Sequence, residues 1–435
     1  MQHRYFHPSI AQHSQRVFLA LSLLVVFLLS ACGGGASSTS DVVQLKYGWW
    51  SDTPAKDNAM RAWIKDFESS HPNIKISAEI LPWDNYWDKL KTTSAGGNAW
   101  DIVGDCSCMI APYYSKNMFV DLSTFSDYQD SVKNLAAGPL KLHNWDNKQY
   151  GLPIGVVVSS LGYSKTMFDA AGVAYPDPLK PMDYPAFKTM LSKLVKKDAS
   201  GKVTQYAINP GSWLTYEGFV YMEGGSTYDK AVNPKKVTIN TPAGIRGLQD
   251  YLDLFQQNLA PPYEQLANGP YGDGEMDSLQ TNKVAIARIG PWAFNDIVTQ
   301  KLNYGIAPLP GAQKAVMVGD ANALAIYRGS KHPKEAWEFL KWASEPHGET
   351  SFAKFSDIPA DKTVQSQLDT IVQPKDYVPT LLVNLKNFTP STMTDKVEIT
   401  TTFSEIITDM AHGKLTAAQA AAKMEQSGNT ILAGQ

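Results

Sequence analysis

The sequence contains little of what several classes of protein depend on. Its 435 residues include only three cysteines, charged residues make up 19% of it, and the formal net charge is −3. Three cysteines cannot form the disulfide framework of a small secreted domain. A negative net charge argues against a nucleic-acid partner, which a basic patch would bind. Because no apolar run reaches about 18 residues, we expect the main body of the chain to be soluble.

Signatures of common enzymes and metal sites are also absent. The sequence has no nucleophile elbow, HExxH motif or phosphate-binding loop. No suitably spaced cysteine or histidine pair lies near Cys106 and Cys108 to complete a metal site. A disulfide across one residue is uncommon, so two small residues in a loop are the favoured interpretation, with a bridge left open. Asp273, Glu275 and Asp277 lack the glycine and closing glutamate of a calcium loop and indicate a helix start. We therefore expect no cofactor, no metal and no enzymatic activity.

The N-terminal segment has the composition of an export signal. Arg4 and Arg16 precede an apolar run over residues 17–29, and no acidic residue lies in or before this run. The residues Leu29-Ser30-Ala31-Cys32 follow, and then a stretch rich in glycine and serine. This pattern resembles a bacterial lipoprotein signal, in which the cysteine becomes the lipidated first residue of the mature protein. An ordinary signal peptide or a transmembrane anchor is the alternative, but the run is short for a hydrocarbon core of ~30 Å.

The lipoprotein resemblance implies a location for the rest of the chain. Residues 1–31 would be a signal peptide, and residues 32–42 a flexible tether that starts at the lipidated Cys32. The mature protein, with a net charge of about −5 after loss of the two arginines, would be anchored to a membrane on its extracytoplasmic side, at the cell surface or in the periplasm.

Segments with strand and helix patterns alternate after this leader. Strands are expected at 42–49, 74–80 and 101–103, and helices between them at 56–68 and at 84–93, where Asp84 is a fair N-cap. This order predicts an α/β fold with a parallel sheet and right-handed crossovers. The remaining expected elements are strands at 150–163, 203–208, 284–289, 304–308 and 323–327, and helices at 165–171, 181–197, 241–257 and 335–344, with three more after residue 377, the last at 416–424.

Aromatic residues are numerous and lie in polar surroundings. The chain has 11 Trp and 20 Tyr, many of them beside Asp, Asn or Gly. Flat apolar rings beside hydrogen-bonding groups are typical of a binding cleft. In parallel sheets ligands bind beyond the carboxyl ends of strands, which here are Trp49 to Asp52 and Asp105 to Cys108.

An ordered series of short segments resembles a known family. The segments are Pro72-Asn73-Ile74, Trp83-Asp84-Asn85-Tyr86, Asp101-Ile102-Val103, Tyr113 to Leu122, Tyr150-Gly151-Leu152-Pro153, Tyr163-Ser164-Lys165 with Phe168, Ala170 and Gly172, Asn282 to Ala287, Gly290-Pro291-Trp292-Ala293, Tyr304 to Pro310 and Glu335 to Leu340. In this order and spacing they resemble the extracellular solute-binding proteins of carbohydrate ABC transporters, the maltose-binding-protein-like group. The resemblance covers essentially the whole mature chain.

The resemblance implies two α/β lobes that close around a ligand, as in a Venus flytrap. The N-lobe would comprise residues 43–155 plus 306–360 and the C-lobe 156–305 plus 361–435, with hinge crossings near Gly155, Gly305 and Ala360. The protein would be a monomer that captures a sugar or oligosaccharide in the cleft between the lobes. It would then deliver the sugar to the permease of an ABC transporter.

A sugar offers an apolar C–H face, which suits aromatic rings, and a rim of hydroxyls, which suits carboxylates and amides. Trp292 is the first candidate, since the resemblance places a tryptophan at this point under the sugar; a core tryptophan is the alternative. Asp52 could instead cap the helix that begins near Lys56, and at least one of Trp49 and Trp50 should face the core. Asp105 could instead cap a loop, and Asp320 and Asn322 could belong to a turn. The candidate ligand-binding residues are Trp292, Trp213, Trp49, Trp50, Asp52, Asp105, Asp320, Asn322, Tyr216 and Glu217.

Three positions depart from the maltose-binding pattern. Val157 stands where a maltose binder has a glutamate, and Cys108 and Met109 stand where it has an acid and an arginine. We therefore do not expect maltodextrin contacts to carry over, and a different or smaller saccharide fits better. The alternatives are a non-sugar solute such as a polyol, peptide or phosphate ester, and a secreted glycoside hydrolase with paired carboxylates.

Overall fold

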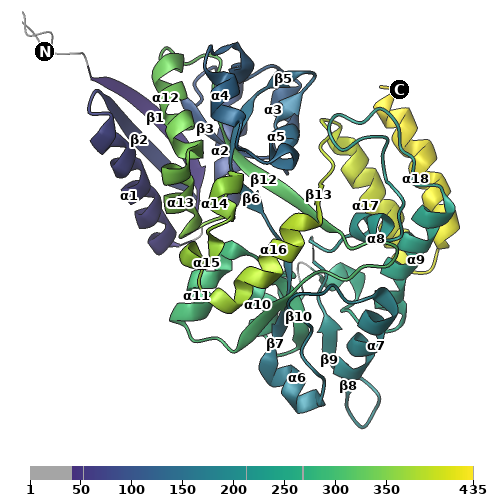
Figure 1. Ribbon diagram of the computed structural model, residues 1–435. Coiled ribbons are helices and arrows are strands. Elements are labelled where there is room, and N and C mark those ends of the chain that lie inside the picture. Colours follow the sequence, from purple (N-terminus) through teal and green to yellow (C-terminus); the bar gives the residue numbers. More distant parts are fainter. Residues whose placement is uncertain (1–41, 52, 212, 267–268, 435) are drawn as a thin grey trace, which may run out of the picture. The chain divides into compact units, whose positions relative to one another are not determined.

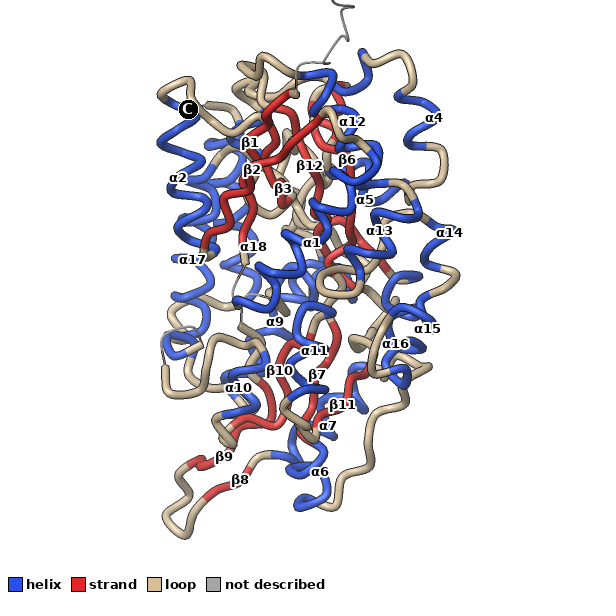
Figure 2. Tube along the Cα trace, turned by 90° about the vertical axis from the view of Figure 1, so that its left-hand side faces the viewer, coloured by secondary structure: helices blue, strands red, loops and turns tan. Residues whose placement is uncertain are grey.

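The computed structural model describes residues 42–51, 53–211, 213–266 and 269–434. The lipoprotein signal with Cys32, and the candidate residue Asp52, lie outside the described residues. The strands of the described part form two larger sheets and one small hairpin (Figures 1 and 2). No helix in this part of the chain is long and apolar enough to cross a membrane.

The first sheet contains the N-terminal strands. Its order is β13 (Phe388–Pro390), β12 (Met317–Ile326), β3 (Ile102–Cys106), β1 (Val43–Trp50) and β2 (Ile74–Leu81), and β6 (Gly151–Val157) also pairs with β12. Strand β1 runs parallel to both β2 and β3, as the alternation of strands and helices predicts. Strand β12 runs antiparallel to β3 and β6 and lies between them. The carboxyl ends of β1 and β3 therefore lie at the same edge of the sheet.

Helices pack on the first sheet through apolar faces. Helix α1 (Pro54–Ser70) begins after Thr53, whose side chain accepts a hydrogen bond from the Lys56 backbone, and buries residues at helical spacing such as Met60 and Phe67. Helix α2 (Trp83–Ala95) begins after Pro82 with no side-chain cap, so the expected N-cap role of Asp84 is wrong. Asp84 lies inside the first turn, where its charge favours the helix dipole. Helices α12 (Pro333–Ser344) and α13 (Pro346–Ala353) pack on this sheet as well.

The second sheet has the order β11 (Tyr304–Ala307), β7 (Ser160–Ser164), β10 (Val284–Ile289), β9 (Val203–Ile208) and β8 (Lys196–Lys197). Strand β7 runs antiparallel to β10 and β11, and β9 runs parallel to β10. The single strand expected over 150–163 is thus two strands, β6 in the first sheet and β7 in the second. Both strands are buried, so the residue pattern does not indicate that the chain passes from the first sheet to the second.

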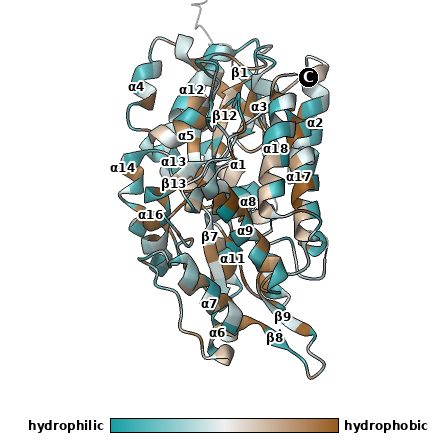
Figure 3. Ribbon diagram, turned by 90° about the vertical axis from the view of Figure 1, so that its right-hand side faces the viewer, coloured by the Kyte–Doolittle hydropathy of each residue, from teal (hydrophilic) through white to brown (hydrophobic). Residues whose placement is uncertain are grey.

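Seven further helices of the described part lie around this second sheet. They are α6 (Lys165–Ala171), α7 (Tyr184–Leu194), α8 (Tyr216–Met222), α9 (Pro242–Gln256), α10 (Met276–Gln280), α11 (Phe294–Thr299) and α16 (Val378–Lys386). The C-terminal helices α17 (Val397–Ala411) and α18 (Ala417–Leu432) pack on each other and on α9 (yellow and teal in Figure 1). Hydrophobic and hydrophilic residues are mixed along these helices in Figure 3, as amphipathic helices require. The three expected C-terminal helices are confirmed.

Shorter elements connect the larger ones. They are α3 (Ala111–Tyr114), α4 (Tyr128–Val132), α5 (Ala137–Leu142), β4 (Asn144–Trp145), β5 (Lys148–Gln149), α14 (Lys362–Gln365), α15 (Leu368–Ile371) and the 3-10 turns η1 (Leu122–Thr124), η2 (Tyr263–Gln265), η3 (Pro291–Ala293) and η4 (Lys375–Tyr377).

The chain passes between the two sheets more than once. It leaves β6 at Val157 and enters β7 at Ser160, and it leaves β11 at Ala307 and enters β12 at Met317. The first passage is held by Asn384 of α16, whose amide donates to the Ser159 carbonyl and the Ser160 hydroxyl, both at 3.0 Å. Sheet membership does not by itself define lobes, so the boundaries at 155/156, 305/306 and 360/361 stay a prediction.

Candidate functional site

A cleft of about 810 Å³ is lined by helices that follow strands of the first sheet and by elements that follow a strand of the second sheet. One wall is α1 with its cap Thr53, and another is η3 with α11. The remaining walls are α13, the residues after it and the segment 371–373. The candidate residue Trp292 lines this cleft, together with Lys56 from the first turn of α1. The cleft is therefore lined in part by the segments that follow β1 and β10.

Trp292 occupies its position because of the residues just before it. Strand β10 ends at Ile289, and Gly290-Pro291 turns the chain into η3. A Cβ atom at Gly290 would lie 2.1 Å from Cη2 of the Trp292 ring, so only glycine leaves room for the indole. The ring itself is half-buried. Trp292 thus reaches the cleft wall directly after a short turn.

A cation lies against the ring of Trp292. The guanidinium carbon of Arg288 is 4.6 Å from the ring centroid, within the range of a cation–π interaction. Nη1 of Arg288 is 2.9 Å from Oε1 of Glu275. Burial raises the pKa of Glu275, while the charge of Arg288 opposes this shift. Sequence analysis assigned Glu275 to a helix start, and Glu275 does precede α10, but its pairing with Arg288 was not foreseen.

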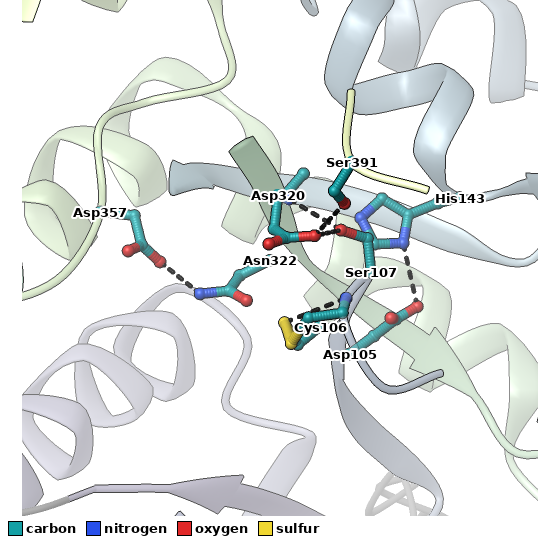
Figure 4. The surroundings of a disulfide bond; sticks show 10 residues. Asp105, Cys106, Ser107, His143, Asp320, Asn322, Asp357 and Ser391 are labelled. Carbon is teal, nitrogen blue, oxygen red and sulfur yellow. Dashed lines mark hydrogen bonds and ion pairs between the residues drawn. A yellow bond between two sulfur atoms is a disulfide. The ribbon is translucent and has the colours of Figure 1, made fainter. Parts of the chain in front are cut away.

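Asn322 and a carboxylate that sequence analysis missed form a buried pair (Figure 4). Nδ2 of Asn322 donates to Oδ2 of Asp357 at 2.6 Å, and Oδ1 of Asn322 is buried without a partner in the described part of the chain. Burial raises the pKa of Asp357 to about 6, against the hydrogen bonds from Asn322 and Ser356 and the charges of Lys56 and Arg288. Positive charge from α1 and from β10 thus faces one carboxylate. No local pattern around Asp357 signals this.

Asp320 and Glu217 come together around one segment. Ser107 Oγ donates to Asp320 at 2.9 Å, and Ser391 donates to the same oxygen (Figure 4). The next residue, Thr392, donates to Glu217 Oε1 at 2.5 Å. Burial raises the pKa of Glu217, and the charge of Asp320 adds to the rise. Two candidate carboxylates are therefore close enough to interact, although they lie on β12 and α8.

The two tryptophans at the end of β1 divide as expected. Trp49 is 4% exposed and belongs to the core, and a Cβ at Gly104 of the neighbouring strand would lie 2.5 Å from its ring. Trp50 is partly buried, stacks on Trp49 at 4.1 Å between ring centroids, and meets Trp83 edge-on at 5.1 Å. Ligand contact by Trp50 stays a prediction.

Asp105 has partners inside the protein, and the cysteine pair differs from the favoured interpretation. The Asp105 side chain is fully buried, with Oδ2 3.2 Å from Nδ1 of His143 and hydrogen-bonded by the Tyr114 hydroxyl, so its partners in the structure are internal. Cys106 and Cys108 form a disulfide, with Cα atoms 5.2 Å apart (Figure 4). The favoured interpretation, in which Cys106 and Cys108 are two unbridged residues in a loop, is therefore wrong. The turn after β3 brings the two Cα atoms within disulfide range.

Trp213 lies just before α8, and Tyr216 is the first residue of this helix. Trp213 is 8% exposed, and its Nε1 donates to the Asn209 carbonyl at 3.3 Å. Burial raises the pKa of Tyr216 well above its usual value. Of the ten candidates, Trp292 alone is among the described residues that line the cleft of about 810 Å³. Ligand contact by all ten stays a prediction.

The sequence matches a protein family over residues 62–380, more than half of the chain. That family is described as bacterial extracellular solute-binding protein. The chain belongs to this family. Two relatives of this solute-binding protein are the diacetylchitobiose binding protein DasA of Streptomyces coelicolor and the multiple sugar-binding protein of Streptococcus mutans. The first is 26% identical over 78% of this chain and 80% of the relative. The second is 25% identical over 81% and 83%.

Solved structures share the fold of this solute-binding protein. An ABC substrate-binding protein from Listeria monocytogenes in complex with cycloalternan superposes with a TM-score of 0.76. The match covers 90% of this chain and all of that one, at 20% identity. The two-lobe, periplasmic-binding-protein-like α/β fold expected from the sequence is thereby confirmed.

Proposed function

We propose that this solute-binding protein captures a carbohydrate in the cleft beside Trp292 and delivers it to the permease of an ABC transporter. The observation that carries the proposal is an indole ring on the wall of a cleft of about 810 Å³. This cleft is lined by residues from α1 and by residues between 291 and 373. A ring of this kind stacks on the C–H face of a sugar. Relatives named for binding diacetylchitobiose and multiple sugars support a saccharide over a peptide or phosphate ester.

The binding cycle in this proposal needs no covalent chemistry. The lobes would be residues 43–155 plus 306–360 and residues 156–305 plus 361–435, and they would close around the sugar as hinged bodies. Asn322, whose buried Oδ1 has no partner in the described part, does not line this cleft, and its contact with the sugar stays a prediction. The closed form would present both lobes to the permease. Incubation with oligosaccharides should therefore leave them uncleaved.

A panel of saccharides in a thermal-shift assay tests the proposal, because a bound ligand raises the melting temperature by mass action. For a saccharide that binds, Trp292→Ala should lower the affinity measured by titration calorimetry by about tenfold or more, through a stacking loss of ~1–3 kcal/mol. Tyr175→Ala serves as the control, since Tyr175 is 44% exposed and does not line the cleft. Unchanged affinity in Trp292→Ala would remove Trp292 from the site.

A further inference from the structure

We propose that Arg288 is a positioning residue that holds the ring of Trp292 in place against the cleft. The proposal rests on the proposed function, since it concerns the ring to which ligand stacking is assigned. Arg288 lies on β10 two residues before Gly290, so both face the same side of the extended segment. The indole occupies the space on this side, with the Arg288 guanidinium 4.6 Å from its centroid and the Gly290 position against its benzene half.

Arg288 is itself firmly held. Its side chain is 17% exposed, and Nη1 lies 2.9 Å from Oε1 of Glu275. Its backbone N–H donates to the Gly274 carbonyl at 2.7 Å, so main chain and side chain both attach to the segment 274–275. A guanidinium fixed by a carboxylate cannot follow the ring if the ring turns, so it favours one ring orientation.

The described residues that line the cleft include Trp292 and do not include Arg288. In this proposal the charge acts on the ring rather than directly on the ligand. A ring that is already oriented loses less conformational freedom on binding, and this raises affinity without a new ligand contact.

The first test needs no ligand. In protein labelled with ¹⁵N at the indole nitrogens, the resonance absent from Trp292→Phe identifies Trp292. We expect Arg288→Met and Glu275→Gln each to shift or broaden this resonance, and Arg288→Lys to have a smaller effect. The matched control is Arg246→Met, because Arg246 is also 2.9 Å from a glutamate, Glu223, but makes no cation–π contact within the described part of the chain. An unchanged Trp292 resonance in Arg288→Met would overturn the proposal.

The second test separates positioning from direct contact. N,N′-diacetylchitobiose and maltotriose are the probes, titrated by calorimetry at pH 8, above the pKa of about 6 of Asp357, which the Arg288 charge influences. Arg288→Met should weaken a probe that binds by roughly five- to tenfold, and should add nothing in a Trp292→Ala background. An equal loss in that background would overturn positioning through Trp292. If neither probe binds the unmodified protein, the sugar proposal loses support while the indole resonance still decides the role of Arg288.

Discussion

Asp357 shows what burial does to a single carboxylate. Its side chain is almost without exposure, and its amide partner Asn322 supplies a hydrogen bond but no charge. Desolvation of the charged form therefore outweighs the hydrogen bonds and the more distant cations, and the pKa rises to about 6. In the unfolded chain the Asp357 carboxyl is exposed to water, and its pKa returns to the ordinary value near 3.8. The folded protein thus keeps a proton at pH values where the unfolded chain has lost it.

This difference predicts how stability depends on pH. Because the folded state binds more protons between about pH 4 and pH 6, the free energy of unfolding contributed by Asp357 falls as the pH rises through this window. Asp357→Asn carries no such proton, so its stability relative to the unmodified protein should improve by about 3 kcal/mol at most from pH 4 to pH 7. Urea unfolding at several pH values measures this. Asp130→Asn, at a side chain that is 87% exposed, controls for the loss of one charge. A difference that stays constant with pH would contradict the prediction.

At the scale of elements, the segment after β13 links two carboxylates that belong to different parts of the fold. Ser391 donates to Asp320 on β12, and Thr392 donates to Glu217 on α8. Each hydroxyl offsets part of the cost of burying a negative charge. The segment is therefore attached to a strand of the first sheet and to a helix of the second half at adjacent residues.

Loss of the Thr392 hydroxyl should destabilise the protein. Thr392→Val keeps the side-chain shape but leaves Oε1 of Glu217 with one donor fewer, at an expected cost of about 1–3 kcal/mol in the free energy of unfolding. The pKa of Glu217 should rise further, since the hydrogen bond from Thr392 holds it down. Thr408→Val on α17 is the matched control, because among the described residues the exposed Thr408 hydroxyl bonds only to the Ser404 carbonyl of its own helix. Equal stability of the two variants would show that the Thr392 bond adds nothing.

At the scale of the whole molecule, the leader sequence and the binding body serve one purpose in the proposed function. A tether keeps a binding protein near its permease and raises the effective concentration of the loaded form there. Residues 32–42 would set the reach of this tether, and Cys32 would carry the lipid.

The anchor is tested by cell fractionation. Cys32→Ala should move the protein from the membrane fraction to the soluble fraction, because the lipid supplies the membrane affinity in this proposal. The thermal shift with a binding saccharide should be unchanged, since Cys32 precedes the described body. Ser30→Ala, two residues earlier, controls for general damage to the signal. Membrane association that survives Cys32→Ala would rule out lipid anchoring at this residue.

The sequence determined the order and type of the larger elements, because these depend on neighbours within one or two turns. Helix α9 begins after its cap Thr241, α18 begins after Thr416, and β1, β2 and β3 follow their apolar patterns. The family resemblance pointed to Trp292, which lines the cleft of about 810 Å³, and its contact with a ligand stays a prediction. The sequence indicated the family through an ordered series of segments, which the family match bears out.

Only the tertiary structure decided which residues meet. The run 150–163 divides between two sheets, because the pairing partners of its halves come from β12 and from β10 and β11, far along the chain. Asp105 faces His143, and Arg288 lies on Trp292 while its charge reaches Asp357. A side chain's type sets what it can bind, but its partners depend on how distant segments pack. The local sequence does not contain that information.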